Sequence, residues 1–226
     1  MRPYFSVRAP HGGPQAIALV LHGGRERSDA PVRANQLAVV RMAPFVSGLS
    51  RAGRGRGLAV GRMRYVVRGW NGTAQAPVAD VRWVLDELAG QYPDVPVALV
   101  GHSMGGRAAI YAADHPSVRV VVGLAPWIEP NDPYRPVAGC DVLVVHGDAD
   151  RITSAKASAA WTRQAATVAA SATYVSVRGD GHAMLRRARL WHELTADYVV
   201  AKMLGDDAAG TGVVAKVLAG EPSLVV

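Results

Sequence analysis

Short apolar runs alternate with longer amphipathic stretches along the chain. The apolar runs are rich in β-branched residues and predict strands, whereas apolar residues spaced three and four apart predict the helices between them. Strands are expected at 4–8, 16–21, 58–67, 95–100, 118–124, 142–146 and 173–177, and helices at 32–49, 78–91, 104–115, 154–169 and 185–204. The runs at 16–21, 95–100 and 142–146 are continuously apolar, which is typical of central parallel strands buried on both faces. The alternation therefore predicts an α/β fold, with one mostly parallel sheet of about six to seven strands and helices on both faces.

The length and composition indicate a single globular domain. Half of the 226 residues are hydrophobic, which allows a sizeable core and excludes a mainly disordered chain. We assign residues 1–204 to this domain and residues 205–226, which are Gly/Asp/Ala-rich and then apolar, to a C-terminal tail without a recognisable pattern. No apolar run approaches the roughly 18 residues that span a bilayer. The N-terminal segment has no signal-peptide pattern, so we expect a cytoplasmic protein.

The charge is distributed unevenly along the chain. The formal net charge is +7, and residues 1–75 contain 12 arginines but only two acidic residues. The segment 51–57 (RAGRGRG) resembles a phosphate-binding run, but no aromatic residues interleave with it and no DNA- or RNA-binding motif is present. We therefore do not expect a nucleic acid as partner. A milder hypothesis is that these arginines favour anionic substrates through their local field.

The segment 101–105 (GHSMG) joins an apolar strand directly to a helical pattern. This sequence is typical of a nucleophile elbow, a turn so tight that the neighbours of the nucleophile must be small. Gly101 and Gly105 meet that requirement and leave the hydroxyl of Ser103 above the edge of the sheet. The helix that follows favours negative charge at its N-terminus, where an oxyanion would form. The alternative is an ordinary strand–helix connection in which Ser103 is only the N-cap.

A nucleophilic serine needs a histidine base. In α/β folds that contain a nucleophile elbow, the base follows the serine and the acid along the chain. Only His182 and His192 lie far enough along the sequence. His182 lies in a glycine-flanked loop after the strand predicted at 173–177, where the edge of the sheet could bring it to Ser103. His192 lies within a helical stretch. We therefore favour His182 as the base.

The third member of such a site is a carboxylate that orients the imidazole. Asp148 and Asp150 both follow the strand predicted at 142–146. Asp150 lies further into the loop and has the better reach, whereas Asp148 is better placed to brace the turn. Asp180 is adjacent to His182 in sequence, but adjacency does not direct one side chain at the other, and Asp-Gly is a common turn pair.

Two backbone N–H groups should complete the site as an oxyanion hole. One belongs to Met104, the residue after the proposed nucleophile. We assign the second to Gly24, in the glycine-rich loop after the strand at 16–21, with its neighbour Arg25 as the alternative and as a candidate substrate-binding residue. No second ligand stands at metal-binding spacing from His22, so the sequence predicts neither a metal nor a cofactor.

Together these motifs resemble the α/β-hydrolase superfamily, and within it the serine esterases. LHGG at 21–24, GHSMGG at 101–106, HGDAD at 146–150 and DGH at 180–182 match its oxyanion loop, elbow, acid loop and histidine loop, in that order. The likeness covers about residues 3–204. It implies hydrolysis of a carboxylic ester of a small molecule through an acyl-enzyme, with Ser103, His182 and Asp150 as the catalytic triad.

The segment GLAPW at 123–127 is also similar to bacterial cutinase-like and dienelactone-hydrolase-related members, in which a tryptophan at this place lines the substrate cleft. This likeness makes Trp127 a candidate cleft wall, although a tryptophan that packs the strand end would look the same. The segment 127–139 is too short for a helical cap domain, so we expect an open cleft. The alternatives are a thioesterase or other acyl hydrolase on the same triad, or a catalytically silent hydrolase fold that binds a ligand.

Overall fold

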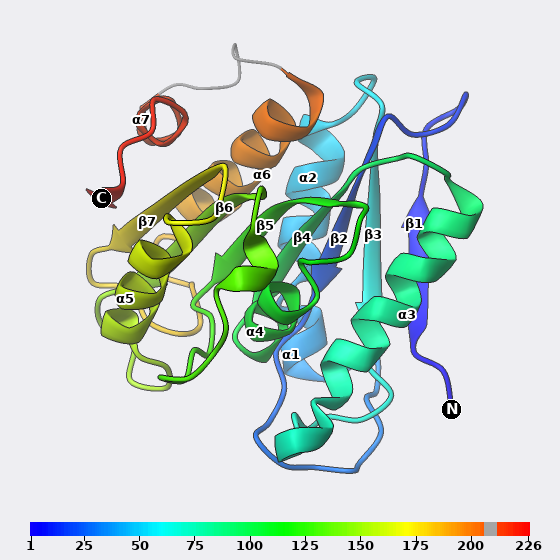
Figure 1. The fold of residues 1–226 in the computed structure, drawn as a ribbon, viewed down its shortest axis with the longest axis horizontal. Coiled ribbons are helices and arrows are strands. Elements are labelled where there is room, and N and C mark those ends of the chain that lie inside the picture. Colours follow the sequence, from blue (N-terminus) through cyan, green and yellow to red (C-terminus); the bar gives the residue numbers. More distant parts are fainter. Residues whose placement is uncertain (206–211) are drawn as a thin grey trace.

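A computed structural model describes residues 1–205 and 212–226 of the chain. The first half contains β1 (Tyr4–Arg8), β2 (Ala16–Leu21), α1 (Leu37–Val40), α2 (Ala43–Ala52), β3 (Leu58–Arg64), a 3₁₀ turn η1 (Gly72–Ala74), α3 (Ala76–Gln91), β4 (Val97–His102) and α4 (Met104–Tyr111). The second half contains β5 (Val118–Leu124), a 3₁₀ turn η2 (Arg135–Val137), β6 (Asp141–Gly147), α5 (Ala155–Ala165), β7 (Ser171–Val177), α6 (Ala188–Leu204), α7 (Val213–Leu218) and β8 (Ser223–Val225). Strands and helices thus alternate as the hydrophobic pattern predicts (Figure 1).

The strands form one sheet in the order β1-β3-β2-β4-β5-β6-β7-β8. β1 pairs antiparallel with β3, and all other neighbours are parallel. The α/β class and the mostly parallel sheet are confirmed, but the expected number of strands, six to seven, is wrong, because the sheet has eight. The additional strand is β8, three residues long, which pairs with β7 through Leu224 and Val175. A strand this short leaves no periodicity to recognise.

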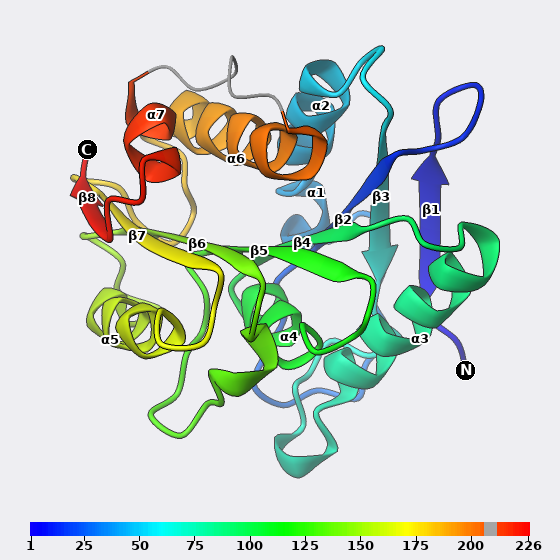
Figure 2. The ribbon, with the colours of Figure 1, turned by 45° about the horizontal axis from the view of Figure 1, so that its top comes forward.

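Helices cover both faces of the sheet (Figure 2). α3, α4 and α5 lie on one face, over a core that includes Leu19, Leu85 and Leu99. α2, α6 and α7 lie on the other, over a core that includes Phe45 and Trp191. Central strands such as β2 are buried along their whole length, as the continuous apolar runs predict.

The helix predicted at 32–49 is two helices, α1 and α2, instead of one. Pro44 lies in the first turn of α2, where its missing N–H needs no helical partner. A proline there starts a new helix rather than continuing α1. The short α1 and the break before α2 shape the surface beside β3. Within the described ranges, no helix combines the length and apolarity needed to cross a membrane.

The parallel arrangement brings several strand ends to the same edge of the sheet. β4 is hydrogen-bonded to β2 on one side and to β5 on the other, and β6 lies between β5 and β7. The carboxyl ends of these strands lead into the loops that contain the predicted site residues. This edge of an open α/β sheet is where such folds bind ligands.

The packing of β8 predicts how the C-terminal segment contributes to stability. Leu224 is buried and belongs to the core beneath α6, whereas the adjacent Val225 is exposed. Leu224→Ala should lower the free energy of unfolding by about 2–3 kcal/mol, because it removes buried apolar contacts. Val225→Ala is the matched control and should change it by less than about 0.5 kcal/mol. Equal urea midpoints for the two variants would contradict the docking of β8.

Candidate active site

Ser103 lies in a strained turn between β4 and α4. Its backbone adopts φ 55° and ψ −118°, a conformation that costs energy for any residue with a Cβ and is typical of functional sites. Its N–H donates to Leu124 O (3.0 Å) and its carbonyl accepts from Trp127 N (3.1 Å), so both backbone groups are fixed by the end of β5. A Cβ on Gly105 would lie 2.6 Å from His22 O, which explains why a glycine follows Met104. The geometry is that of the elbow the sequence predicts.

His182 and Asp150 meet at the same sheet edge. His182 Nδ1 lies 2.8 Å from Asp150 Oδ2, and the Asp150 side chain is fully buried. The second carboxylate oxygen accepts the N–H groups of Ile152 (2.7 Å) and Thr153 (3.0 Å). Burial alone would raise the pKa of Asp150, but hydrogen bonds from two histidines and two backbone amides outweigh it, and the net pKa lies well below the usual range. Asp150 is therefore an ionised, immobile partner for His182.

A second histidine also holds this carboxylate. His146, fully buried at the end of β6, places Nε2 3.1 Å from Asp150 Oδ2 and Nδ1 2.9 Å from Ser158 Oγ. The hydroxyl of Thr153 lies 2.9 Å from the same Oδ2 and 3.1 Å from His182 Nδ1. The sequence prediction missed both His146 and Thr153. The signal was a histidine at a strand end, four residues before the acid, and a hydroxyl three residues after it.

His102 connects the loop of His182 to the turn that contains Ser103. His102 Nε2 donates to the carbonyl of His182 (2.9 Å), and the two rings lie 4.7 Å apart. Burial, and next the charge of His182, lower the pKa of His102 to about 3, so its imidazole is neutral. Because His102 directly precedes Ser103, this hydrogen bond places His182 beside the elbow. The sequence prediction treated His102 only as part of the motif.

The other carboxylates and histidine have different partners. Asp148 accepts the N–H of Gly179 (2.7 Å) and so braces the two loops. Asp180 accepts the N–H of Arg187 (3.1 Å) and the indole N–H of Trp191 (2.9 Å), within the loop that follows β7. His192 packs edge-on against Phe45, with ring centroids 4.6 Å apart. Among the carboxylates in the described part of the chain, Asp150 is therefore the one that pairs with His182.

Gly24 and Met104 lie against each other. A Cβ on Gly24 would lie 2.5 Å from Met104 Sδ and 2.5 Å from Arg68 O, so only glycine fits. Among the described residues, neither Gly24 N–H nor Met104 N–H has a hydrogen-bond acceptor. Two free amides beside the elbow are the groups that an oxyanion hole requires. Arg25 N–H, by contrast, donates to Arg68 O (2.8 Å), which occupies the alternative donor.

Trp127 and Arg25 border this region in different ways. Trp127 is half-buried, and its indole packs over the guanidinium of Arg107, which lies 4.5 Å from the ring centroid. Arg107 is held in turn by Asp132 (2.6 Å) and packs over Trp70. This cluster anchors the segment after β5 next to Ser103. The side chain of Arg25 is exposed beside Gly24.

A hydroxyl in a strained turn, an imidazole on a buried carboxylate, and two free amides together can perform acyl transfer. In the described part of the chain, no group of three or more His, Cys, Asp or Glu side chains is arranged to hold a metal ion. Comparisons with known proteins agree with this chemistry. A sequence profile described as serine aminopeptidase, S33, matches residues 12–140, more than half of the chain.

The chain belongs to the S33 serine aminopeptidase family. Among its relatives is a monoglyceride lipase of Mus musculus, 35% identical over 109 residues, which are 48% of this chain and 33% of that protein. A monoglyceride lipase of Homo sapiens is 36% identical over 104 residues, covering 46% of this chain and 32% of that protein. This chain thus aligns with about one third of the length of these two relatives.

Solved structures share the fold of this S33 family member. Est1E from Butyrivibrio proteoclasticus has a TM-score of 0.65 at 16% identity and covers 89% of this chain and 95% of its own. A serine hydrolase without a lid from Xanthomonas campestris has a TM-score of 0.62 at 21% identity, covering 90% of each chain. The α/β-hydrolase fold that the four motifs imply is confirmed.

The contact between Gly24 and Met104 predicts the effect of one added methyl group. Gly24→Ala should lower kcat of ester hydrolysis about 10²-fold, because the loop must shift away from Met104 and misplace an oxyanion donor. Gly90→Ala is the matched control, since a Cβ there meets no atom within 4 Å. Its kcat should be unchanged. A fully active, folded Gly24→Ala variant would contradict the assigned oxyanion hole.

Two buried histidines make stability depend on pH. Burial lowers the pKa of His22 to about 4 and that of His102 to about 3. Below pH 6.5 the unfolded chain binds protons that the folded chain does not, so stability is highest above pH 6.5 and falls with acidification. Each histidine should contribute a loss of about 1.4 kcal/mol per pH unit between pH 6.5 and its folded pKa. Urea denaturation at pH 7 and pH 5 measures this, and His102→Gln should remove about half of the loss.

Proposed function

We propose that the protein is a serine hydrolase that cleaves a carboxylic ester through an acyl-enzyme on Ser103. The observation that carries the proposal is the 2.8 Å contact between His182 Nδ1 and the buried Asp150, beside the strained turn at Ser103. Membership of the S33 family and the likeness to monoglyceride lipases support the same reaction class.

The proposed reaction begins when Ser103 Oγ attacks the ester carbonyl. The proton of the hydroxyl passes to His182 Nε2, because Nδ1 is engaged by Asp150. Asp150 stabilises the imidazolium, and the N–H groups of Gly24 and Met104 stabilise the oxyanion. His182 then protonates the leaving alcohol. A water molecule, deprotonated by His182, attacks the acyl-enzyme and regenerates Ser103.

The segment between β5 and β6 suggests an accessible substrate. It contains only the 3₁₀ turn η2, so no cap domain is inserted at this point. Trp127 is half-buried, and its backbone N–H donates a hydrogen bond to the carbonyl of Ser103. This position beside Ser103 supports a role for Trp127 as an apolar wall of the cleft. The proposed substrate is therefore a small ester, or an ester whose acyl group projects from a larger molecule. Arg25 beside Gly24 is the proposed polar contact at the rim.

Paired substitutions of the two neighbouring aspartates test the triad. Asp150→Asn should lower kcat for p-nitrophenyl butyrate about 10⁴-fold, because the amide cannot hold the same tautomer of His182. Asp148→Asn is the matched control and should keep kcat within about threefold, since the Asp148 carboxylate accepts a hydrogen bond from Gly179 N–H and, among the described residues, none from His182. Similar losses in both folded variants would contradict the assignment of Asp150.

The histidines provide the second test of the proposed function. His182→Ala and Ser103→Ala should each lower kcat by about 10⁴-fold or more, and the double variant should lose little further, because the triad acts as a unit. His192→Ala should retain activity, since His192 packs on Phe45. A panel of aryl esters, thioesters and aminoacyl anilides then separates esterase from thioesterase and peptidase activity. Turnover of anilides alone would overturn the proposed ester specificity.

A further inference from the structure

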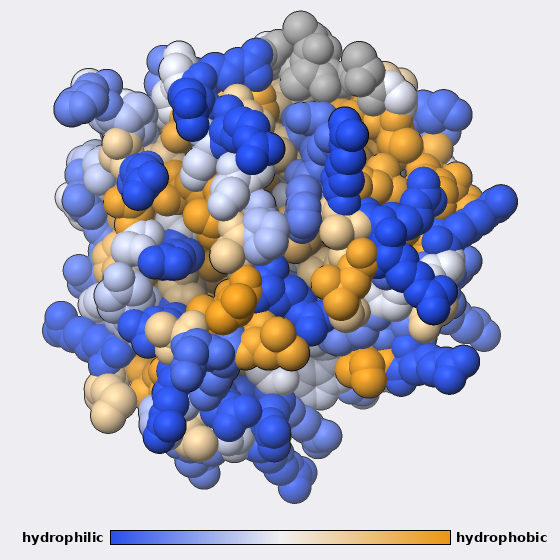
Figure 3. All heavy atoms as spheres, turned by 180° about the vertical axis from the view of Figure 1, so that it is seen from behind, coloured by the Kyte–Doolittle hydropathy of each residue, from blue (hydrophilic) through white to orange (hydrophobic). Residues whose placement is uncertain are grey.

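A groove lies beside α2 on the face of the sheet opposite α3, α4 and α5. Figure 3 shows this face, where apolar side chains are surrounded by hydrophilic ones. The groove consists of two adjoining cavities of about 270 and 550 Å³, which share Val46 and Arg62 as lining residues. We call it the β1–α2 groove, because β1 and β3 form one wall and α1 and α2 form the other.

The groove exists because α2 does not cover the edge of the sheet. Phe45 and Leu49 of α2 pack into the core beneath α6. On β1, Phe5 points to the other face and packs against Trp83 of α3, whereas the alternate residues Tyr4, Ser6 and Arg8 line the groove. This side of β1 is therefore a sheet face that none of the described helices covers, and its side chains are available to a ligand.

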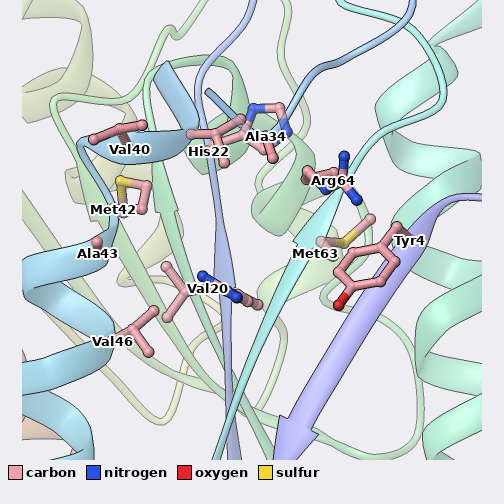
Figure 4. A pocket seen from close by; sticks show the side chains of 12 residues that line it. Tyr4, Val20, His22, Ala34, Val40, Met42, Ala43, Val46, Met63 and Arg64 are labelled. Atoms are coloured by element: carbon pink, nitrogen blue, oxygen red, sulfur yellow. The ribbon is translucent and has the colours of Figure 1, made fainter. Parts of the chain in front are cut away.

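One end of the groove is mostly apolar, although His22, Arg62 and Arg64 also line it. Its lining includes Val20, Val39, Val40, Met42, Val46 and Met63. Figure 4 shows Val20 on the floor, with Val40, Met42 and Val46 on one side and Met63 and Tyr4 on the other. Val20, Met42 and Met63 are buried beneath the recess, and the valines that remain accessible to a ligand are Val39, Val40 and Val46. An alkyl chain lying in the recess would remove this apolar surface from water.

The other end of the groove is strongly basic. Arg8, Arg51, Arg54 and Arg62 line it, together with the hydroxyls of Ser47 and Ser50. Among the described residues these four guanidinium groups have no carboxylate or other hydrogen-bond partner, and no acidic residue lines either cavity. Four unpaired arginines around one hollow favour an anion, which can accept bidentate hydrogen bonds from them.

We propose that the β1–α2 groove binds a single-chain anionic amphiphile, with its alkyl chain at the Val20 end and its carboxylate or phosphate on the arginines. The order of apolar and basic walls matches such a molecule from tail to head. A nucleic acid would leave the aliphatic end unused, because the aromatic rings in its described lining are those of Tyr4 and His22, and the Tyr4 ring already packs against the guanidinium of Arg64. The site does not involve Ser103, so the proposal is independent of the proposed esterase activity.

The groove nevertheless adjoins the proposed active site. His22, at the end of β2, lines the apolar end. A Cβ on the next residue, Gly23, would lie 3.3 Å from the Cβ of Ser103. A bound chain would therefore rest against the strand that leads into the loop of Gly24. An amphiphile in the groove is placed to affect that loop without occupying the cleft.

Isothermal titration of the full chain with dodecyl phosphate and with dodecanoate, both below their micelle concentrations, tests the proposal. Each should bind with one site per chain, and the tighter of the two identifies the headgroup. Dodecanol and inorganic phosphate should each bind at least tenfold more weakly, because each lacks one half of the ligand. Binding of inorganic phosphate as tight as that of dodecyl phosphate would overturn the amphiphile and leave a simple anion site.

Charge reversal separates the groove from general attraction to a basic protein. Arg51→Glu/Arg54→Glu should weaken binding of dodecyl phosphate at least tenfold, whereas Lys156→Glu/Arg163→Glu makes the same change of charge on α5, on the opposite face, and should alter it less than twofold. Ala43→Trp, at an exposed position on the apolar rim, should weaken binding by filling the recess. Thermal midpoints establish that each variant is folded.

Three results would overturn the proposal. The first is equal weakening by the two charge-reversed pairs. The second is undiminished binding in Arg51→Glu/Arg54→Glu, which would place the amphiphile elsewhere, including the cleft at Ser103. The third is association with phosphatidylglycerol vesicles but not with monomeric amphiphile, which would make this face a membrane-docking surface.

Discussion

The carboxylate of Asp150 is the group on which the organisation of the candidate site depends. It is fully buried, and an ionised carboxylate in such a place is stable only if its oxygens are hydrogen-bonded. Five donors meet that requirement: two imidazoles, one hydroxyl and two backbone amides. They also fix its orientation. Because His182 is one of the five, the hydrogen bonds that keep Asp150 ionised also orient His182, the proposed base.

This network extends into the core through His146. Its ring joins Asp150 to Ser158, whose hydroxyl lies in the buried face of α5. On the other side of the site, His102 holds the backbone of His182 from the end of β4. The loop of His182 is thus held by two strands that are not adjacent in the sheet. Rigid strand ends hold the imidazole of His182 more accurately than a free loop would.

The sequence was sufficient to predict that Asp150 and His182 come together, because the proposed chemistry limits the choice. A serine in a tight strand–helix turn needs glycine neighbours, and the order of acid and base along the chain leaves few candidates. The supporting residues His146, Thr153 and His102 were missed, since a buried histidine looks like any other until its partners are known. The break before α2 and the strand β8 were missed because short elements have little periodicity.

The arginines of the first third show the same limit. Their number was evident from composition, but the sequence could not show that Arg8, Arg51, Arg54 and Arg62, from three separate segments, line one hollow. That convergence depends on the antiparallel pairing of β1 with β3, and on the end of α2. The number of arginines in a sequence therefore predicts a positive electrostatic field, whereas only the fold shows whether they converge on one binding site.

Peptide mapping of the rapidly quenched reaction with a p-nitrophenyl ester tests whether Ser103 is acylated during turnover. We expect the peptide that contains Ser103 to gain the mass of the acyl group, and this adduct to accumulate in the first turnover and disappear once the substrate is exhausted. Steady turnover with no acyl group on Ser103, or with the acyl group on another residue, would contradict this expectation.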